Sequence, residues 1–186
     1  MYENEETMSK KNDNSRLGME KDLAKLMEEI KKQDFDSPEE LNDFMKNFTG
    51  KSLNDLPERT DDKGRSQDLV YEAYDQSISK GKKLIKQALE LDPDNADAYN
   101  YLAELETDID KAIKQYEKAV TAGERSLGKK FFKENKGYFW GMIETRPYMR
   151  AKAGLADCFY IQKNLDKAIE IYEDMLDLNP DDNLGI

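Results

Sequence analysis

Residues 110–120 read DKAIKQYEKAV, and residues 166–176 read DKAIEIYEDML. Both copies carry Ala, Ile and Tyr at the same offsets, which place these three side chains on one stripe of an α-helix. A second pair of matching segments, ALELDPDN at 88–95 and MLDLNPDD at 175–182, ends each helix just before a proline. The chain therefore contains a helical repeat.

The composition of the 186 residues, 38% hydrophobic and 37% charged, suits an open helical array better than a thick globular core. The net charge of −11 argues against nucleic acid and anionic membranes as partners. No apolar run approaches the roughly 20 residues that span a bilayer, and the N-terminus lacks the layout of a secretory signal. We therefore expect a cytoplasmic protein.

The chain has no histidine and only one cysteine, Cys158. This composition removes the usual general base and excludes a Cys/His zinc site. The segment Asp92-Pro93-Asp94-Asn95 offers oxygen ligands but lacks the glycine and the terminal glutamate of a calcium loop. We therefore expect no catalytic residues, no metal site and no cofactor.

Helical periodicity recurs along the chain, and no segment shows the alternating pattern of a strand. We expect an all-α fold in which antiparallel helix pairs stack as a short superhelical array behind an N-terminal helical extension. The expected segments are a disordered tail at 1–15, the helical extension at 16–50, a linker at 51–64, the repeat array at 65–182 with an insertion at about 122–147, and a C-terminal end at 183–186.

The spacing of small and large apolar residues in the array follows one pattern in two successive units. In the last unit these residues are Leu155, Ala156, Phe159, Ala168 and Tyr172, and in the middle unit they are Tyr99, Leu102, Ala103, Ala112, Tyr116 and Ala119. The array thus resembles the 34-residue tetratricopeptide repeat. More narrowly, GYFWGMIETRPYMRAKAGLADC at 137–158 is similar to tetratricopeptide proteins related to the eukaryotic suppressor-of-tumorigenicity-seven proteins, a similarity that implies no known activity.

The resemblance to the tetratricopeptide repeat implies a non-catalytic scaffold that binds a partner peptide or protein in its concave groove. Some tetratricopeptide domains hold the C-terminal carboxylates of a partner with Lys and Asn on the first helix of each unit. Here the corresponding positions include Asn100, which is compatible, but also Glu104 and Asp157, which would repel such a tail.

An insertion interrupts the array. The two DKAI phrases begin at residues 110 and 166. Their separation is about 22 residues longer than the length of one repeat. The surplus is basic and aromatic, and it holds Arg125, Lys129, Lys130, Phe131, Phe132, Lys133, Lys136, Tyr138, Phe139, Trp140 and Arg146. Two interpretations are open: these residues lengthen a helix and pack against its neighbours, or they anchor a partner peptide.

The residues predicted to contact a partner are Tyr99, Asn100, Phe132, Tyr138, Trp140, Arg146 and Arg150. An alternative from another class is a small-ligand-binding or catalytic domain, which would use the aromatic pocket of the insertion with Glu144, Arg146 and Arg150. The last repeat is followed only by Asn183-Leu184-Gly185-Ile186, with no capping helix. Because an uncapped repeat exposes an apolar face, two interpretations are open: the sequence is truncated at Ile186, or that face binds a partner such as a second copy of the chain.

Overall fold

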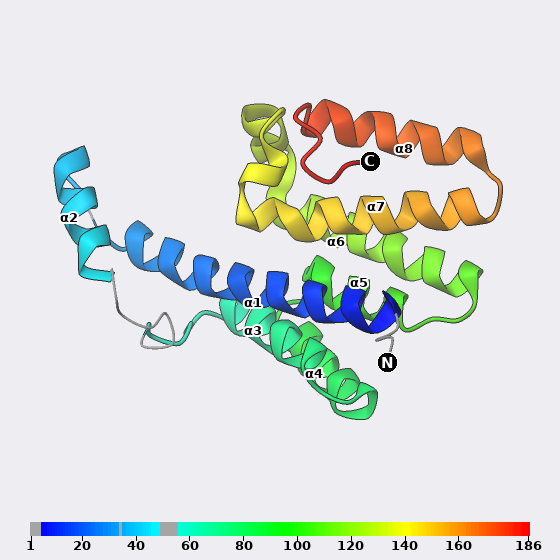
Figure 1. Ribbon diagram of the computed structural model, residues 1–186, viewed down its shortest axis with the longest axis horizontal. Helices are drawn as coiled ribbons and strands as arrows, with labels where there is room; N and C mark the ends of the chain where they lie inside the picture. Colours follow the sequence, from blue (N-terminus) through cyan, green and yellow to red (C-terminus); the bar gives the residue numbers. More distant parts are fainter. Residues whose placement is uncertain (1–4, 34, 49–55) are drawn as a thin grey trace. The chain divides into compact units, whose positions relative to one another are not determined.

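The computed structural model describes residues 5–33, 35–48 and 56–186 (Figure 1). These residues form helices and no strand, which confirms the predicted all-α class. The helices are α1 (Glu5–Lys31), α2 (Pro38–Phe48), α3 (Asp62–Tyr74), α4 (Ile78–Leu91), α5 (Ala96–Glu104), α6 (Ile109–Asn135), α7 (Arg146–Ile161) and α8 (Leu165–Leu178), with short 3-10 turns η2 (Phe139–Gly141) and η3 (Ile143–Thr145). The chain divides into two compact units, Met1–Thr60 and Asp61–Ile186.

The first unit holds α1 and α2. Helix α1 begins at Glu5, inside the stretch 1–15 for which composition predicts a disordered tail; its Glu, Met and Lys residues are good helix formers. Helix α2 begins with a reciprocal cap: the Glu40 N–H donates to Ser37 Oγ over 3.2 Å, and the Asp36 N–H donates to Glu40 Oε2 over 3.0 Å. The sequence predicts this start from Ser37 and Pro38.

The second unit begins with α3, three residues earlier than the expected start at about Arg65. Asp61 caps the helix, because its Oδ1 accepts a hydrogen bond of 2.9 Å from the Gly64 N–H. The aspartate and glycine that suggest a linker therefore form the first turn of a helix. Residues 51–55 of the expected linker lie outside the described residues.

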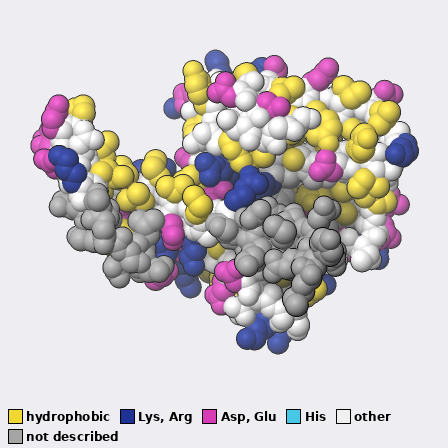
Figure 2. Space-filling view, viewed as in Figure 1, with side chains coloured by type: hydrophobic (Ala, Val, Ile, Leu, Met, Phe, Trp, Pro, Cys, Tyr) yellow, Lys and Arg dark blue, Asp and Glu magenta, His cyan; other side chains and the backbone are white. Residues whose placement is uncertain are grey.

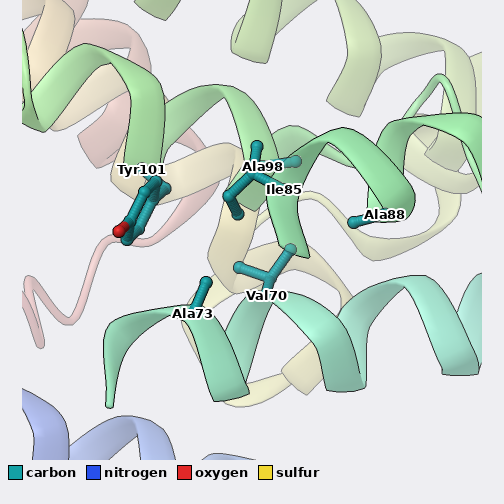
Figure 3. Packing of buried hydrophobic residues seen from close by; sticks show 6 residues of the cluster. All are labelled: Val70, Ala73, Ile85, Ala88, Ala98 and Tyr101. Atoms are coloured by element: carbon teal, nitrogen blue, oxygen red, sulfur yellow. The ribbon is translucent and has the colours of Figure 1, made fainter. Parts of the chain in front are cut away.

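Helices α3, α4 and α5 enclose the first part of the array core (Figure 3). The buried members of this cluster are Val70, Ala73, Ile85, Ala88, Ala98 and Tyr101. Gly81 stands where the repeat pattern expects alanine. A Cβ at this position would collide with the hydroxyl of Tyr101, so the tyrosine takes the space of the missing methyl group.

The doubled DKAI phrase begins the second helix of each of the two later pairs. Helix α6 packs between α5 and α7, and α7 runs antiparallel to α8 (Figure 1). Ala112 and Ala168 are both buried in one cluster with Leu155 and Phe159 of α7. The phrase therefore places its small alanine at the close contact between neighbouring helices, as the repeat pattern predicts.

The segment α6 reaches Asn135 as two helices, which are joined across non-helical backbone at Gly128. The φ of Gly128, 76°, lies in the left-handed region that favours glycine. Helix α7 then begins with Pro147 in its first turn, where a missing N–H costs no helical hydrogen bond.

Candidate partner-binding site

The first helices of the three pairs, α3, α5 and α7, contact one another in sequence order. Their side chains form two rows of equivalent positions. Asp97 follows Gln67 by 30 residues, and Arg150 follows Asp97 by 53. In the second row, Glu104 follows Tyr74 by the same 30 residues, and Asp157 follows Glu104 by the same 53. We call the surface formed by both rows the first-helix face.

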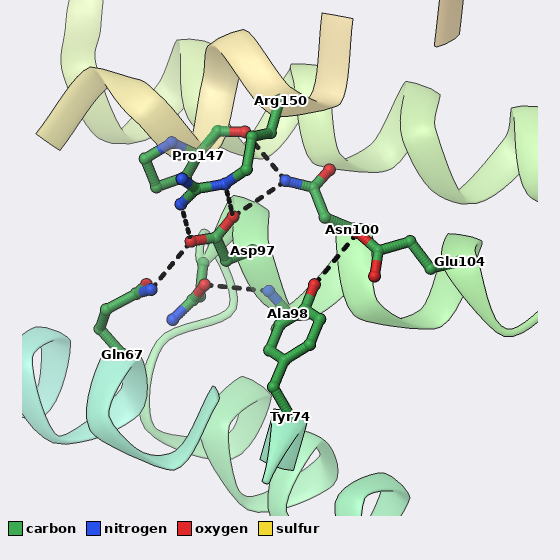
Figure 4. A network of polar contacts seen from close by, with 9 residues as sticks. Gln67, Tyr74, Asp97, Ala98, Asn100, Glu104, Pro147 and Arg150 are labelled. Atoms are coloured by element: carbon green, nitrogen blue, oxygen red, sulfur yellow. Dashed lines mark hydrogen bonds and ion pairs between the residues drawn. The ribbon is translucent and has the colours of Figure 1, made fainter. Parts of the chain in front are cut away.

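Asp97 is the centre of the first row (Figure 4). Its carboxylate is 2% exposed and accepts hydrogen bonds from Arg150 Nε at 3.0 Å and Arg150 Nη2 at 2.6 Å. Gln67 Nε2 donates a further bond of 2.9 Å from α3. A buried carboxylate of this kind is stable only when it is paired and hydrogen-bonded. The row therefore ties three helices together and leaves little net charge.

Asn100 extends this network between α5 and α7. Its Nδ2 donates to Asp97 Oδ1 at 3.0 Å and to the backbone oxygen of Pro147 at 2.9 Å. Its Oδ1 is buried and has no hydrogen-bond partner among the described residues. The structure thus brings two of the predicted contact residues, Asn100 and Arg150, into one network, in which their donors point to other parts of the chain.

The second row is acidic and accessible. The Tyr74 hydroxyl donates to Glu104 Oε1 at 3.1 Å, and the Tyr172 hydroxyl donates to Asp157 Oδ1 at 2.6 Å, while both carboxylate residues are exposed. Burial raises the pKa of Tyr74 well above its usual value, and the Glu104 charge adds to the shift. Burial and the bond to Asp157 raise the pKa of Tyr172 to about 12. These tyrosines remain neutral donors that orient the two carboxylates.

Most aromatic residues of the insertion lie in a second core. Phe139 is fully buried, and its ring lies 5.0 Å from that of Phe132, 6.1 Å from that of Phe131 and 6.2 Å from that of Tyr148. The same cluster includes Met175 and Leu178 of α8. For these phenylalanines the packing interpretation of the insertion fits the geometry, and the predicted contact residue Phe132 is half-buried and packs against this core.

Trp140 and Arg146 are brought together at the edge of this core. The guanidinium of Arg146 lies 5.5 Å from the centre of the Trp140 ring, and Arg146 Nε donates to the Trp140 backbone oxygen at 3.2 Å. Both side chains are half-buried, whereas the Tyr138 side chain is 74% exposed. Of the insertion residues predicted to bind a partner, Tyr138 is thus the most exposed.

Tyr99 lines a different part of the surface from the other six predicted residues. It lines a hollow of about 490 Å³ on α5 and α6, together with lysines such as Lys111 and Lys114 and with Arg125, and none of the other six lines it. Its hydroxyl donates to the backbone oxygen of Pro93 at 3.2 Å, and Arg125 pairs with Asp94 at 2.6 Å.

Two members of the first-helix face, Gln67 and Asp97, are absent from the residues predicted from sequence. The available signal is the equal spacing of the two rows. An acid stands 53 residues before Arg150, and another stands 53 residues before Asp157. This register becomes visible only when the length of the insertion between α5 and α7 is known.

Membrane-spanning helices and metal-binding side-chain groups were sought in the described part of the chain. Among residues 5–33, 35–48 and 56–186, no helix is long and apolar enough to cross a membrane. Within the same residues, no group of three or more His, Cys, Asp and Glu side chains could hold a metal ion. The chain is thus an all-α repeat protein built from stacked antiparallel helix pairs.

Comparison with protein families agrees with this class. Models of the tetratricopeptide repeat match residues 84–121 and residues 142–183, and these two matches support the tetratricopeptide repeat family. Searches of curated proteins and of solved structures find no match. The second matched segment covers η3, α7 and α8, so the repeat resumes where the insertion ends.

Proposed function

We propose that the chain is a non-catalytic scaffold that binds a partner protein or peptide on the first-helix face. Tetratricopeptide repeats generally mediate protein–protein interactions, and stacked repeats present extended concave surfaces for them. The observation that carries the proposal is the pair of matched rows on α3, α5 and α7, of which the second presents exposed Glu104 and Asp157.

The chemistry of this face selects its partner. The first row is neutralised internally by the ion pair of Asp97 and Arg150, so it supplies shape and rigidity. The second row offers carboxylates oriented by tyrosine hydroxyls, which suit lysine or arginine side chains of an extended segment and repel a carboxylate tail. Trp140, Arg146 and Tyr138 would form an additional aromatic and basic wall beside α7.

The alternative of a small-ligand or catalytic pocket in the insertion has no observation in its favour. It requires Arg146 and Arg150 to face a common pocket with Glu144. Arg150 instead pairs with Asp97, and Arg146 lies over Trp140. The narrower resemblance to the suppressor-of-tumorigenicity-seven proteins rests on residues 137–158 and adds no activity.

Affinity purification from the source cells tests the proposal. The bait is the full chain, compared with the double variant Glu104→Lys/Asp157→Lys and with a control reversal at Glu90, which is exposed on α4 and lies outside both rows. We expect partners that bind the wild type and the Glu90→Lys control to be lost from the double variant. Circular dichroism confirms that each bait is folded. Identical partner sets for all three baits would refute the use of this face.

The double variant Trp140→Ala/Arg146→Ala tests the wall in the same experiment. Both residues are half-buried at the edge of the core, so the variant must first show wild-type helix content. Unchanged partners with an intact fold would remove the insertion from the binding surface.

A further inference from the structure

Helix α8 has four apolar residues, Leu165, Ile169, Tyr172 and Leu176, separated by four, three and four residues. This spacing places them on one side of the helix and is the spacing of a helix-pairing seam. We call this set the α8 seam. Three of its members are strongly exposed: Leu165 at 48%, Ile169 at 53% and Leu176 at 39%. The seam covers about three turns of helix.

The equivalent residues on α6 are buried, and their contacts show what covers such a seam. The matching positions of the earlier repeat are Ile109, Ile113, Tyr116 and Val120. All four belong to or pack against a buried cluster that contains Leu155, Cys158 and Phe159 of α7. Ile113 is 9% exposed, whereas its counterpart Ile169 is 53% exposed. The seam of α6 is therefore covered by another helix, α7.

The segment after α8 leaves the seam uncovered among the described residues. The helix ends at Leu178, and Leu184 then packs against the cluster of Phe139, Met175 and Leu178. Met175 and Leu178 are buried, while Leu176 between them is exposed. The C-terminal residues thus cover a different side of α8.

An acidic ridge runs beside the α8 seam. Each seam residue is followed directly by an acid: Asp166, Glu170, Glu173 and Asp177. Asp177 pairs with Lys136 at 2.9 Å, and the other three have no ion-pair partner among the described residues. The corresponding positions on α6 are Asp110, Lys114, Glu117 and Thr121, which do not form a ridge of one sign. Figure 2 shows hydrophobic and acidic side chains together at the surface over α8.

We propose that the α8 seam binds an amphipathic helix of a partner protein whose apolar stripe is bordered by lysine or arginine. The covered seam of α6 indicates that the occupant is a helix, and the acidic ridge indicates the charge along its edge. An antiparallel pairing of α8 with the α8 of a second copy would bring two acidic ridges together, which is unfavourable. The α8 seam meets the first-helix face at Tyr172, whose hydroxyl donates to Asp157. The tests of this inference therefore change Ile169, Glu170 and Glu173, which do not belong to the first-helix face.

A designed peptide tests this inference with the full chain. The probe is a fluorescein-labelled helix of about three heptads, with leucine at the seam positions and lysine at the flanking positions. The matched probe carries glutamate at the same flanking positions. We expect the lysine-edged probe to bind saturably in fluorescence anisotropy and the glutamate-edged probe to bind at least about tenfold more weakly.

Two variants assign the binding to the α8 seam. Ile169→Glu should weaken the lysine-edged probe at least about tenfold, because a carboxylate would enter an apolar contact. Ile78→Glu is the matched control, since Ile78 is a similarly exposed isoleucine, at 59%, on α4. The double reversal Glu170→Lys/Glu173→Lys should exchange the preference and bind the glutamate-edged probe. Circular dichroism verifies the helix content of each variant.

Three results would overturn the inference: absence of binding by the lysine-edged probe, equal binding of both probes, or equal losses in Ile169→Glu and Ile78→Glu. Analytical ultracentrifugation supplies a further decision. A concentration-dependent dimer of the wild type that Ile169→Glu abolishes would identify a second copy as the occupant of the α8 seam. This result would agree with the sequence-based expectation of self-association and would overturn the inference of a basic partner helix.

Discussion

Replacing Asp97 with alanine should destabilise the array by about 3 kcal/mol. Removing one partner of a buried ion pair generally costs about 3–5 kcal/mol, because the other charge stays in the protein without compensation. Asp97 is only 2% exposed, but Arg150 is 24% exposed and water can solvate part of its guanidinium. The smaller end of the range therefore applies. This cost is a large fraction of the roughly 5–15 kcal/mol that stabilise a typical domain.

Further variants separate the free energy of the Asp97–Arg150 ion pair from the contributions of the surrounding residues. Arg150→Ala should cost at least as much as Asp97→Ala, since it leaves a buried carboxylate with only the amides of Gln67 and Asn100 as donors. The double variant should cost about 4 kcal/mol instead of the sum of the two, which corresponds to a coupling of about 2–3 kcal/mol. Arg150→Lys keeps the charge but loses the bidentate contact, so its cost should be intermediate.

Urea unfolding at pH 7, followed by far-ultraviolet circular dichroism, measures these free energies. The exposed pair of Lys86 and Glu90 on α4, with 3.9 Å between its charged atoms, provides a control cycle. Its coupling should stay below about 0.5 kcal/mol. Single Asp97 and Arg150 variants within about 0.5 kcal/mol of the wild type, or strictly additive effects, would refute the reasoning that this network holds α3, α5 and α7 together.

Three further predictions concern the helix contacts, the insertion and the tyrosines. Gly154→Ala should destabilise the array by about 1–3 kcal/mol in urea unfolding, because the new methyl group would collide with the ring of Tyr116; an unchanged midpoint would contradict this contact. Phe139→Ala should cost about 3–5 kcal/mol if the insertion forms a core, and a loss below about 1 kcal/mol would argue against that role. Native Tyr172 keeps its proton up to about pH 12, while unfolded tyrosine ionises near pH 10, so unfolding releases protons between these values and stability should fall as pH rises through this window. Urea midpoints that stay constant from pH 9 to about pH 11 would contradict this prediction.

Local signals in the sequence identify much of the fold. The alanines of the DKAI phrases, the prolines after α4 and α8, and the Ser37 cap of α2 each act within a few residues, and the helices they imply are present. The longer reach of α6 is harder to predict. Gly128 indicates a helix end, and the backbone is non-helical there. A second helix nevertheless follows directly and reaches Asn135, and its residues Phe131 and Phe132 pack against Phe139 and Tyr148.

The candidate site is harder to predict from the sequence than the fold, because its contacts join residues that lie far apart along the chain. Arg150 and Asn100 are visible as polar residues on first helices, but their partners are not. Whether Arg150 faces a ligand or pairs with Asp97 depends on how the chain folds between these two residues, which lie 53 positions apart. The same limitation applies to Phe132, whose aromatic and basic neighbours suggest a binding surface although its ring packs against Phe139 and Tyr148.

The insertion also determines which side of α8 remains open. Phe139 and its neighbours cover Met175 and Leu178, so α8 is anchored on that side. The uncovered side carries the α8 seam and its acidic ridge, and the first-helix face carries Glu104 and Asp157. Both proposed surfaces therefore select basic partners by the same electrostatic mechanism. Because their charges are exposed and screened by salt, both interactions should weaken as ionic strength rises, whereas a contact made by the apolar seam alone would not.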